Sequence, residues 1–338
     1  MTLPRGKLSL PAGCVTGVGS LPFTDPAEAI RFVEDHGPVL PWWPQLPRRA
    51  PGEDVIAQGL GALIALFEPA DKPSCWQVRR GQAGALGQGL AGEVGLAVET
   101  AAGFFAFEAA LCGGRFPRAA AVKAQLAGPL TLAHCVFLEG QALAGQTGWL
   151  DRLSGFVARQ AVWQVNRLKQ LHETVVCVVD EPALGQGLAG TPSVSLAALT
   201  HVVRAIRAAG AVVGLHCCAP LPAPFLAALD LDWLSFDAHL PVDPGGWLAL
   251  ARPILARAGT LASGLVPTAE TKLGVPALVG LWSRQAATLG DPRAVAARTV
   301  VTATCGLGLA TPAAAAAVFA RCARVGEEIG RIALSARS

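Results

Sequence analysis

The sequence has 338 residues, of which 52% are apolar and 15% charged, and its formal net charge at pH 7 is +3. A chain of this length and composition can bury a large core, which excludes an intrinsically disordered protein. The small net charge gives no reason to expect nucleic acid or an anionic membrane surface as a partner.

The N-terminal segment 1–13 lacks the apolar core and cleavage site of a secretory signal peptide. No run reaches the roughly 18 apolar residues that a membrane span requires. The nine cysteines are scattered and odd in number, which is unlike a secreted disulfide framework and favours free thiols, metal ligands or core packing. We therefore expect a soluble, cytoplasmic protein without a membrane partner.

Strand-like apolar segments recur along the chain with helix-length gaps between them. Most are apolar at both odd and even positions, which is typical of parallel strands covered on both faces. The segment 39–46 is the weakest, because Pro41 and Pro44 cannot donate to a strand ladder. The eight predicted strands are 14–20, 39–46, 122–128, 174–180, 211–218, 233–239, 260–266 and 299–306.

The helices between these strands have clear start and stop signals. Asp25 supplies an N-cap, with Pro26 at the first helical position. Apolar residues at helical spacing predict a helix over 150–173, and the helix that begins near residue 193 ends at Gly210, a C-terminal cap. Thr311, followed by a proline, opens an Ala-rich final helix.

Eight strands, each followed by a helix or helical turn, predict an α/β fold of the TIM (β/α)8 barrel type. We expect one domain, a single barrel over 1–338, with a long excursion around 47–121. The hexapeptide GQGLAG at 87–92 and 185–190 matches the dinucleotide pattern G-x-G-x-x-G. Neither copy has the required strand, helix and acidic residue around it, so both are interpreted as loop glycines.

Polar and metal-capable side chains follow the predicted strands at one end. In a TIM barrel the active site gathers at the carboxyl ends of the strands, so these side chains are expected to lie around one mouth. They are Ser20 on the first strand, Asp180 and Glu181 on the fourth, His216 to Cys218 on the fifth, Asp237 and His239 on the sixth, and Cys305 on the eighth.

Strand alternation separates the two adjacent cysteines of the fifth strand. Successive side chains point to opposite faces, so His216 and Cys218 share one face while Cys217 takes the other. If His216 faces the barrel axis, Cys305 can reach the same centre from the eighth strand. A histidine with two thiolates suits Zn²⁺, and Asp237 is a candidate oxygen ligand.

Most other cysteines are interpreted as packing residues, because cysteine is among the most buried residue types. Cys75 lies in the excursion and receives no assignment from the sequence. The packing set is Cys14, Cys112, Cys135, Cys177, Cys217 and Cys322.

Six short segments, taken in order, resemble the catalytic barrel of cobalamin-independent methionine synthase, within the methionine synthase and uroporphyrinogen decarboxylase superfamily. The likeness spans residues 14–308, and DEPAL is its most specific part. The segments are VGSLP (18–22), KAQLAGPLT (123–131), VDEPAL (179–184), LHCC (215–218), LSFDA (234–238) and TCGLG (304–308).

The resemblance implies a zinc-dependent methyltransferase that methylates homocysteine to methionine. Carried over residue by residue, it implies His216, Cys218, Asp237 and Cys305 as the zinc ligands. The family has Glu where this chain has Asp237, whose shorter side chain makes that ligand the least secure. Zinc coordination deprotonates a thiol, and the thiolate is the nucleophile in methyl transfer.

The resemblance also implies that Ser20 holds the amino-acid end of homocysteine and that Asp180, a catalytic residue, pairs with the substrate ammonium. Two features depart from the family. The segment SGLVPT, 263–268, lacks the family's seventh-strand histidine. A chain of this length is expected to be a short single-barrel form, without the second barrel that helps to bind folate.

The methyl donor is therefore open between methyltetrahydrofolate and methylcobalamin or a corrinoid protein. A large donor needs an open mouth, and Trp42 and Trp43 are candidates for its rim, although core packing is their default role. Two alternatives to a thiol methyltransferase also stay open. One is a porphyrinogen decarboxylase-like enzyme, whose family uses no zinc and has an Arg-rich N-terminal signature that this chain lacks. The other is a non-catalytic zinc- or corrinoid-binding barrel, against which the presence of Asp180 argues.

Overall fold

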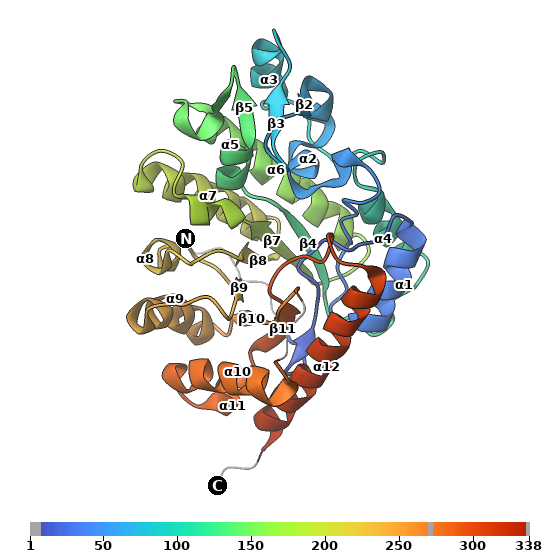
Figure 1. Ribbon diagram of the computed structural model, residues 1–338, viewed down its shortest axis with the longest axis vertical. Coiled ribbons are helices and arrows are strands. Elements are labelled where there is room, and N and C mark those ends of the chain that lie inside the picture. The colour runs from blue at the N-terminus through green and yellow to red at the C-terminus, as the bar shows by residue number, and fades with distance from the viewer. Residues whose placement is uncertain (1–7, 270–272, 336–338) are drawn as a thin grey trace.

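The computed structural model describes residues 8–269 and 273–335, and at its centre is a curled sheet of seven parallel strands with helices packed outside it (Figure 1). The strand order is β1-β11-β10-β9-β8-β7-β4. Residues 1–7, part of the segment judged unlike a signal peptide, lie outside the described residues. The strands are β1 Cys14–Val15, β4 Val122–Ala127, β7 Val175–Asp180, β8 Val212–Cys217, β9 Trp233–Asp237, β10 Thr260–Val266 and β11 Thr299–Ala303.

Seven of the eight predicted strands are confirmed, and with them the α/β class. The predicted strand 39–46 is not in the sheet, as expected if its prolines prevent a continuous ladder. It makes two isolated parallel bridges instead, from Trp42 to Lys123 on β4 and from Gln45 to Ser20 just after β1. This segment therefore lies between the two edge strands of the curled sheet, but the described residues contain no eighth strand ladder.

The helices with sequence signals begin where those signals lie. The Asp25 carboxylate accepts a hydrogen bond from the Ala27 amide, and the Thr311 hydroxyl accepts one from Ala314. Gly210 follows its helix in the left-handed region at a φ of 79°, which suits glycine at this position. The helices of the outer layer are α1 Pro26–His36, α5 Pro129–Cys135, α6 Trp149–Lys169, α7 Pro192–Ala208, α8 Ala223–Ala227, α9 Pro244–Ala256, α10 Val275–Leu289, α11 Pro292–Ala296 and α12 Pro312–Leu334.

The excursion forms a second, smaller structure at one end of the molecule (Figure 1). Its four-stranded sheet has the order β2-β3-β5-β6, so it also recruits a segment that follows α5. Its elements are η1 Pro51–Glu53, α2 Val55–Leu60, η2 Gly61–Leu66, β2 Phe67–Pro69, β3 Trp76–Val78, α3 Ala83–Gly89, α4 Ala102–Cys112, β5 Val136–Leu138, β6 Gln141–Ala142 and η3 Leu143–Gly145; the remaining short helix is η4 Pro182–Gln186, after β7.

The inner face of the large sheet changes from apolar to polar along its strands. Val178 on β7 belongs to a buried apolar cluster, whereas Asp180, two residues further on the same face, is a buried carboxylate. The same change takes place on β9 between Trp233 and Ser235. Because alternate residues share a face, the carboxyl ends of the strands present a polar layer above an apolar one.

Trp42 and Trp43 are 0% and 1% exposed, so their default role of core packing is confirmed and they do not form a rim. The Trp42 indole stacks on Phe319 of α12 and donates a hydrogen bond to the Gly19 carbonyl. Cys112, expected to pack, is exposed at the end of α4.

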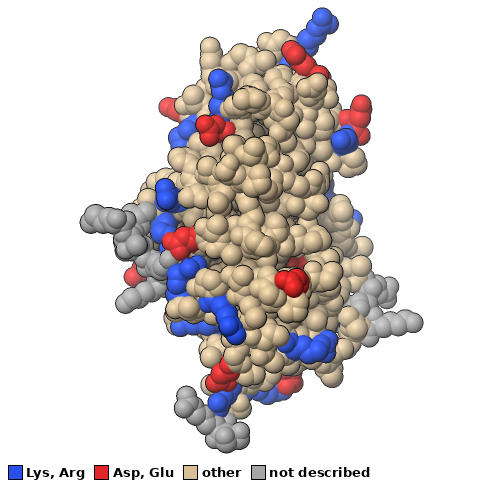
Figure 2. All heavy atoms as spheres, turned by 90° about the vertical axis from the view of Figure 1, so that its left-hand side faces the viewer, with Lys and Arg blue, Asp and Glu red and all other residues tan. Residues whose placement is uncertain are grey.

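Within residues 8–269 and 273–335, none of the helices has the length and apolar character needed to cross a bilayer. Figure 2 shows the face on the left of Figure 1, where charged side chains of both signs are scattered over a mostly uncharged surface. This face offers no broad single-sign field for a polyanionic partner.

Candidate functional site

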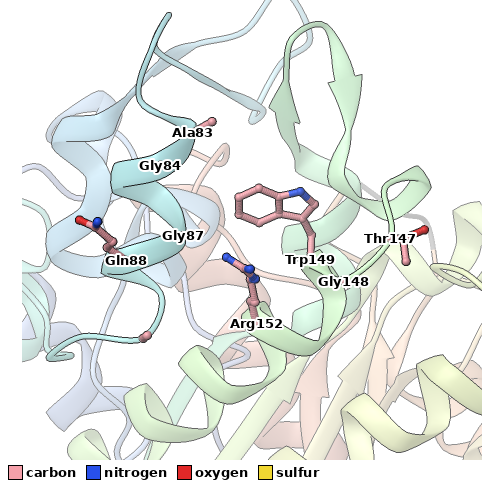
Figure 3. A pocket seen from close by; sticks show the side chains of 9 residues that line it. Ala83, Gly84, Gly87, Gln88, Thr147, Gly148, Trp149 and Arg152 are labelled. Atoms are coloured by element: carbon pink, nitrogen blue, oxygen red, sulfur yellow. The ribbon is translucent and has the colours of Figure 1, made fainter.

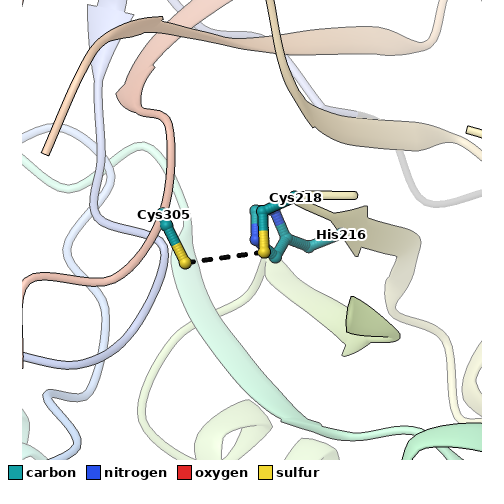
Figure 4. Close-up of side chains that lie close together, drawn as sticks. All are labelled: His216, Cys218 and Cys305. Carbon is teal, nitrogen blue, oxygen red and sulfur yellow. Dashed lines mark hydrogen bonds between the residues drawn. The ribbon is translucent and has the colours of Figure 1, made fainter. Parts of the chain in front are cut away.

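Three metal-capable side chains meet at the carboxyl ends of β8 and β11 (Figure 4). His216, Cys218 and Cys305 each offer one ligand atom, and these atoms lie within 4.8 Å of one another. His216 is in β8, Cys218 directly follows that strand, and Cys305 lies two residues beyond β11. Cys217 is fully buried among apolar side chains on the opposite face, as strand alternation requires.

The two thiols of this cluster are hydrogen-bonded to each other. Their Sγ atoms are 3.6 Å apart. The hydrogen bond with Cys218, assisted by His216, lowers the pKa of Cys305 to about 4 in spite of its burial. The same hydrogen bond and burial raise the pKa of Cys218. The contact thus favours the thiolate form of Cys305 and the thiol form of Cys218.

His216 is oriented by its neighbour on β9. Its Nδ1 lies 2.9 Å from the Ser235 hydroxyl oxygen. A second partner on one ring nitrogen is the usual way in which a metal-binding histidine is fixed in place. An oriented imidazole and two thiols make a donor set that fits Zn²⁺, which prefers nitrogen and sulfur ligands.

Asp237, predicted as a further ligand, is near this cluster but not part of it. Its Oδ1 accepts a hydrogen bond of 2.8 Å from the His239 amide, which turns the carboxylate toward its own backbone. Burial raises the pKa of Asp237, and the charge of Cys305 adds to that effect. The structure thus brings three of the four predicted ligands together, and the fourth, Asp237, lies near them without joining the cluster.

Asp180 ends β7 directly beside His216, its register partner on β8. Its side chain is buried, and its Oδ1 has no hydrogen-bond partner among the described residues. Burial raises the pKa of Asp180 to about 6, although nearby His216 and Lys123 lower it. A buried carboxylate oxygen without a partner is a suitable acceptor for a cationic group.

Lys123 is a functional candidate that the sequence analysis did not assign. It is buried on β4, and its Nζ donates to the Val18 carbonyl at 2.6 Å and to Gln125 Oε1 at 3.0 Å. Burial lowers the pKa of Lys123 to about 8, while the charge of Asp180 raises it. The sequence did contain a signal for it, a lysine inside an otherwise apolar strand. A buried lysine needs hydrogen-bond or charged partners, which marks such a position as unusual.

Glu181 has a structural role next to the site. Its carboxylate accepts hydrogen bonds from the amides of Leu130 and Thr131, at 3.0 and 2.7 Å, and from the Thr131 hydroxyl at 2.6 Å. It thereby provides a hydrogen-bond acceptor for backbone N–H groups in the first turn of α5, which have no partner within the helix. A Cβ on Gly128 would overlap this carboxylate, so glycine is needed there. In the Asp-Glu-Pro motif, the first acid faces the site and the second holds a helix.

We expect Glu181→Gln to destabilise the fold by about 1–3 kcal/mol, because an amide nitrogen then faces a backbone N–H donor that loses its acceptor. Urea denaturation followed by circular dichroism measures the change. Glu173→Gln is a matched control away from this helix, and it should leave the midpoint unchanged. Equal midpoints for Glu181→Gln and the wild type would contradict the assigned role.

A cavity of about 530 Å³ opens beside Cys305. Ser20 lies in its wall, close against the backbone of Gly306, where a Cβ would overlap the Ser20 hydroxyl. The wall also contains two acids that the sequence analysis missed, Glu53 and Asp54. Both have local partners within the protein, and no histidine or cysteine next to them marked them in the sequence.

The two acids of the cavity wall differ in what holds them. Glu53 is fully buried and pairs with Arg49 at 2.6 Å. Asp54 caps α2 by accepting hydrogen bonds of 2.8 Å from the Ile56 and Ala57 amides. Burial raises the pKa of both carboxyl groups. The cavity wall therefore contains acidic and hydroxyl groups in addition to Cys305.

A second cavity, of about 520 Å³, lies between α3 and the start of α6 (Figure 3). The Arg152 guanidinium lies over the Trp149 ring, 5.4 Å from its centroid. The first GQGLAG copy contributes Gly87, Gln88 and Ala91 to the wall. The lining residues include no histidine, cysteine or acid.

Solved methyltransferase structures share this fold. A B12-independent methionine synthase from Shewanella sp. W3-18-1, in complex with selenomethionine, matches with a TM-score of 0.53 and 14% identity over 77% of this chain and 71% of that chain. A methyltransferase from Methanosarcina mazei matches with a TM-score of 0.56 and 13% identity over 98% of this chain and 96% of that chain. The expected resemblance is thus supported at the level of the fold.

No protein-family model matches the sequence, and comparison with curated proteins gives no match either. At 13–14% identity, a structural likeness establishes a common fold and leaves the reaction to be argued from the site itself.

Proposed function

We propose that this protein is a zinc-dependent methyltransferase that transfers a methyl group to a thiol, and that the thiol is homocysteine. The observation that carries the proposal is the cluster of His216, Cys218 and Cys305 at the carboxyl ends of two strands. The shared fold with a methionine synthase solved in complex with selenomethionine supports the same reaction class.

The donor set supports zinc in particular. Three protein ligands leave a fourth position for a substrate, which is the arrangement of catalytic zinc sites. When bound there, zinc would lower the pKa of a substrate thiol and hold it as the thiolate. Asp237 stays in the proposal as an exchangeable ligand, for which it would have to give up its contact with the His239 amide.

The remaining residues provide binding and orientation. Asp180 would accept the substrate ammonium with its unpartnered oxygen, and Lys123 would moderate the negative charge of that carboxylate. Ser20 would hold the amino-acid end of the substrate from the cavity wall. Ser235 keeps His216 in the orientation that the cluster requires.

We also propose that the chain forms a single barrel, in which the segment 39–46 completes the ring between β4 and β1. The two isolated bridges support this, together with the Lys123 contact to Val18, which joins β4 to the residues after β1. The methyl donor is proposed to be methylcobalamin, a methylated corrinoid protein or methyltetrahydrofolate.

Zinc-loaded protein incubated with homocysteine and each donor should produce methionine with at least one of them. Mass spectrometry of the product and the cobalamin spectrum measure the transfer. Homoserine, which lacks the thiol, is the control substrate and should give no product. A chelator should stop turnover, and added Zn²⁺ should restore it. Zinc-loaded protein that yields no methionine from any donor would refute the proposed activity.

A further inference from the structure

Two cysteines outside the candidate metal site stand next to each other where the small sheet meets α5. Cys75 immediately precedes β3, and Cys135 is the last residue of α5 and immediately precedes β5. The two strands are parallel, with Trp76 opposite Val136. One step back along both strands, position 75 is therefore opposite position 135.

This register gives the spacing that a disulfide needs. Neighbouring strands lie about 4.8 Å apart, and bridged cysteines have Cα atoms about 4.4–6.8 Å apart. The two thiols are close enough for the charge of Cys75 to raise the pKa of Cys135, and both are free and only partly buried. The parallel pairing of β3 with β5 already brings the two residues side by side.

We propose that Cys75 and Cys135 form a reversible disulfide on exposure to hydrogen peroxide, and that this bond restrains the wall of the cavity beside Cys305. In this proposal Cys135 is a disulfide partner, whereas the sequence analysis expected it only to pack in the core. Cys75, which the sequence analysis did not assign, is the other partner.

The chemistry balances with one peroxide per disulfide. The thiolate sulfur of Cys75 attacks one peroxide oxygen, and the O–O bond breaks. Hydroxide is the leaving group, and Cys75 becomes a sulfenic acid. The sulfur of Cys135 then attacks Cys75 sulfur and displaces its hydroxyl group. The two thiol protons combine with the two released hydroxides, so two thiols are oxidised and one peroxide is reduced to two waters.

The surroundings favour this order of events. Ser74, the residue before Cys75, lines the cavity, and Cys75 itself is only partly buried, so dissolved peroxide can reach this thiol. Burial, together with the charge of Cys75, raises the pKa of Cys135 to about 12, so Cys135 remains a thiol until the sulfenic acid is beside it. A thiol with so little thiolate is a poor first target for peroxide.

The cavity wall is connected to this pair on both sides of Cys75. Ser74 itself has a left-handed φ of 54°, a strained conformation for a residue with a side chain. On the other side, the Trp76 indole donates to Asp54 Oδ2 at 3.3 Å, and Asp54 also lines the cavity. A bond from Cys75 to α5 would tie this wall to the helix that Glu181 anchors.

Peptide mapping of the zinc-loaded protein tests the bond itself. After peroxide treatment and alkylation of the remaining thiols, a non-reduced digest should contain a peptide pair joined through Cys75 and Cys135, lighter than its components by two hydrogen atoms. Dithiothreitol should release both peptides. Cys75→Ser and Cys135→Ser should each remove the joined pair, whereas Cys112→Ser, at an exposed thiol, should keep it. Alkylation of both Cys75 and Cys135 after peroxide treatment would overturn the proposal.

The effect on the cavity rests on the proposed function and has a separate measurement. The KM for homocysteine should change several-fold on oxidation, return with dithiothreitol, and stay constant in Cys75→Ser and Cys135→Ser. Oxidation of Cys218 and Cys305 would persist in those variants, so it is distinguished from the proposed bond. A joined peptide pair with an unchanged KM would overturn the restraint on the cavity. A joined pair in a protein without methyl transfer would refute the proposed function and leave the disulfide standing.

Discussion

Cys218→Ser and Cys305→Ser should each abolish zinc binding, whereas Cys217→Ser should retain about one zinc per chain. Both predicted ligand sulfurs lie in the cluster with His216, while Cys217 points into the apolar packing on the other face. A serine hydroxyl does not provide the anionic soft donor that zinc selects. Metal analysis of the purified proteins by mass spectrometry measures the loss.

Methyl transfer should fall with the metal, by about 100-fold or more, since outer-shell changes alone cost about 10–100-fold. Cys217→Ser is the matched control, because it changes the adjacent residue in the same way. It should lower stability by about 1–3 kcal/mol through burial of a hydroxyl, with zinc and activity retained. Zinc lost from Cys217→Ser but kept by Cys218→Ser would reverse the assignment of the two faces.

The part of this site that the sequence predicted depends on local geometry. Two-residue periodicity separates Cys217 from His216 and Cys218 whatever the rest of the chain does. Placing Cys305 beside them required the assumption of a curled parallel sheet, because β10 and β9 lie between β11 and β8. The prediction of strands from long apolar runs supplied that assumption.

The parts that the sequence did not predict depend on details of side chains and on distant pairing. Asp237 is on the expected strand end, but a hydrogen bond to the amide two residues ahead holds its carboxylate away from the sulfurs. Core packing was the default expectation for Trp42 and Trp43, but their partners on α12 and α6 were not predicted. Neither feature has a pattern in the sequence.

The contact of Cys75 with Cys135 was also beyond the sequence. It follows from two strands of three residues each, β3 and β5, which pair across almost sixty intervening residues. Strands this short have no clear periodicity, so neither their existence nor their register could be derived from the residues alone. The acids Glu53 and Asp54 were missed for the same reason, since only the folded excursion brings them to the cavity.

Asp180→Asn should weaken homocysteine binding by about 1–3 kcal/mol, or roughly 5- to 150-fold in dissociation constant, and leave the zinc content unchanged. The asparagine keeps the size of the side chain but removes the negative charge that would face the substrate ammonium. The carboxylate is buried, so its interaction with a cation is poorly screened by solvent and salt. Calorimetric titration of the zinc-loaded protein measures the affinity.

A substrate analogue sharpens this test into a double-mutant cycle. 4-Mercaptobutyrate has the thiol and carboxylate of homocysteine but no ammonium, so the wild type should bind it more weakly. Asp180→Asn should then bind the analogue about as well as the wild type does, because the partner of the carboxylate is already absent. Glu181→Gln, at the neighbouring carboxylate that holds α5, should alter stability without this loss of affinity. If wild type and Asp180→Asn bind homocysteine equally, Asp180 does not contact the substrate ammonium.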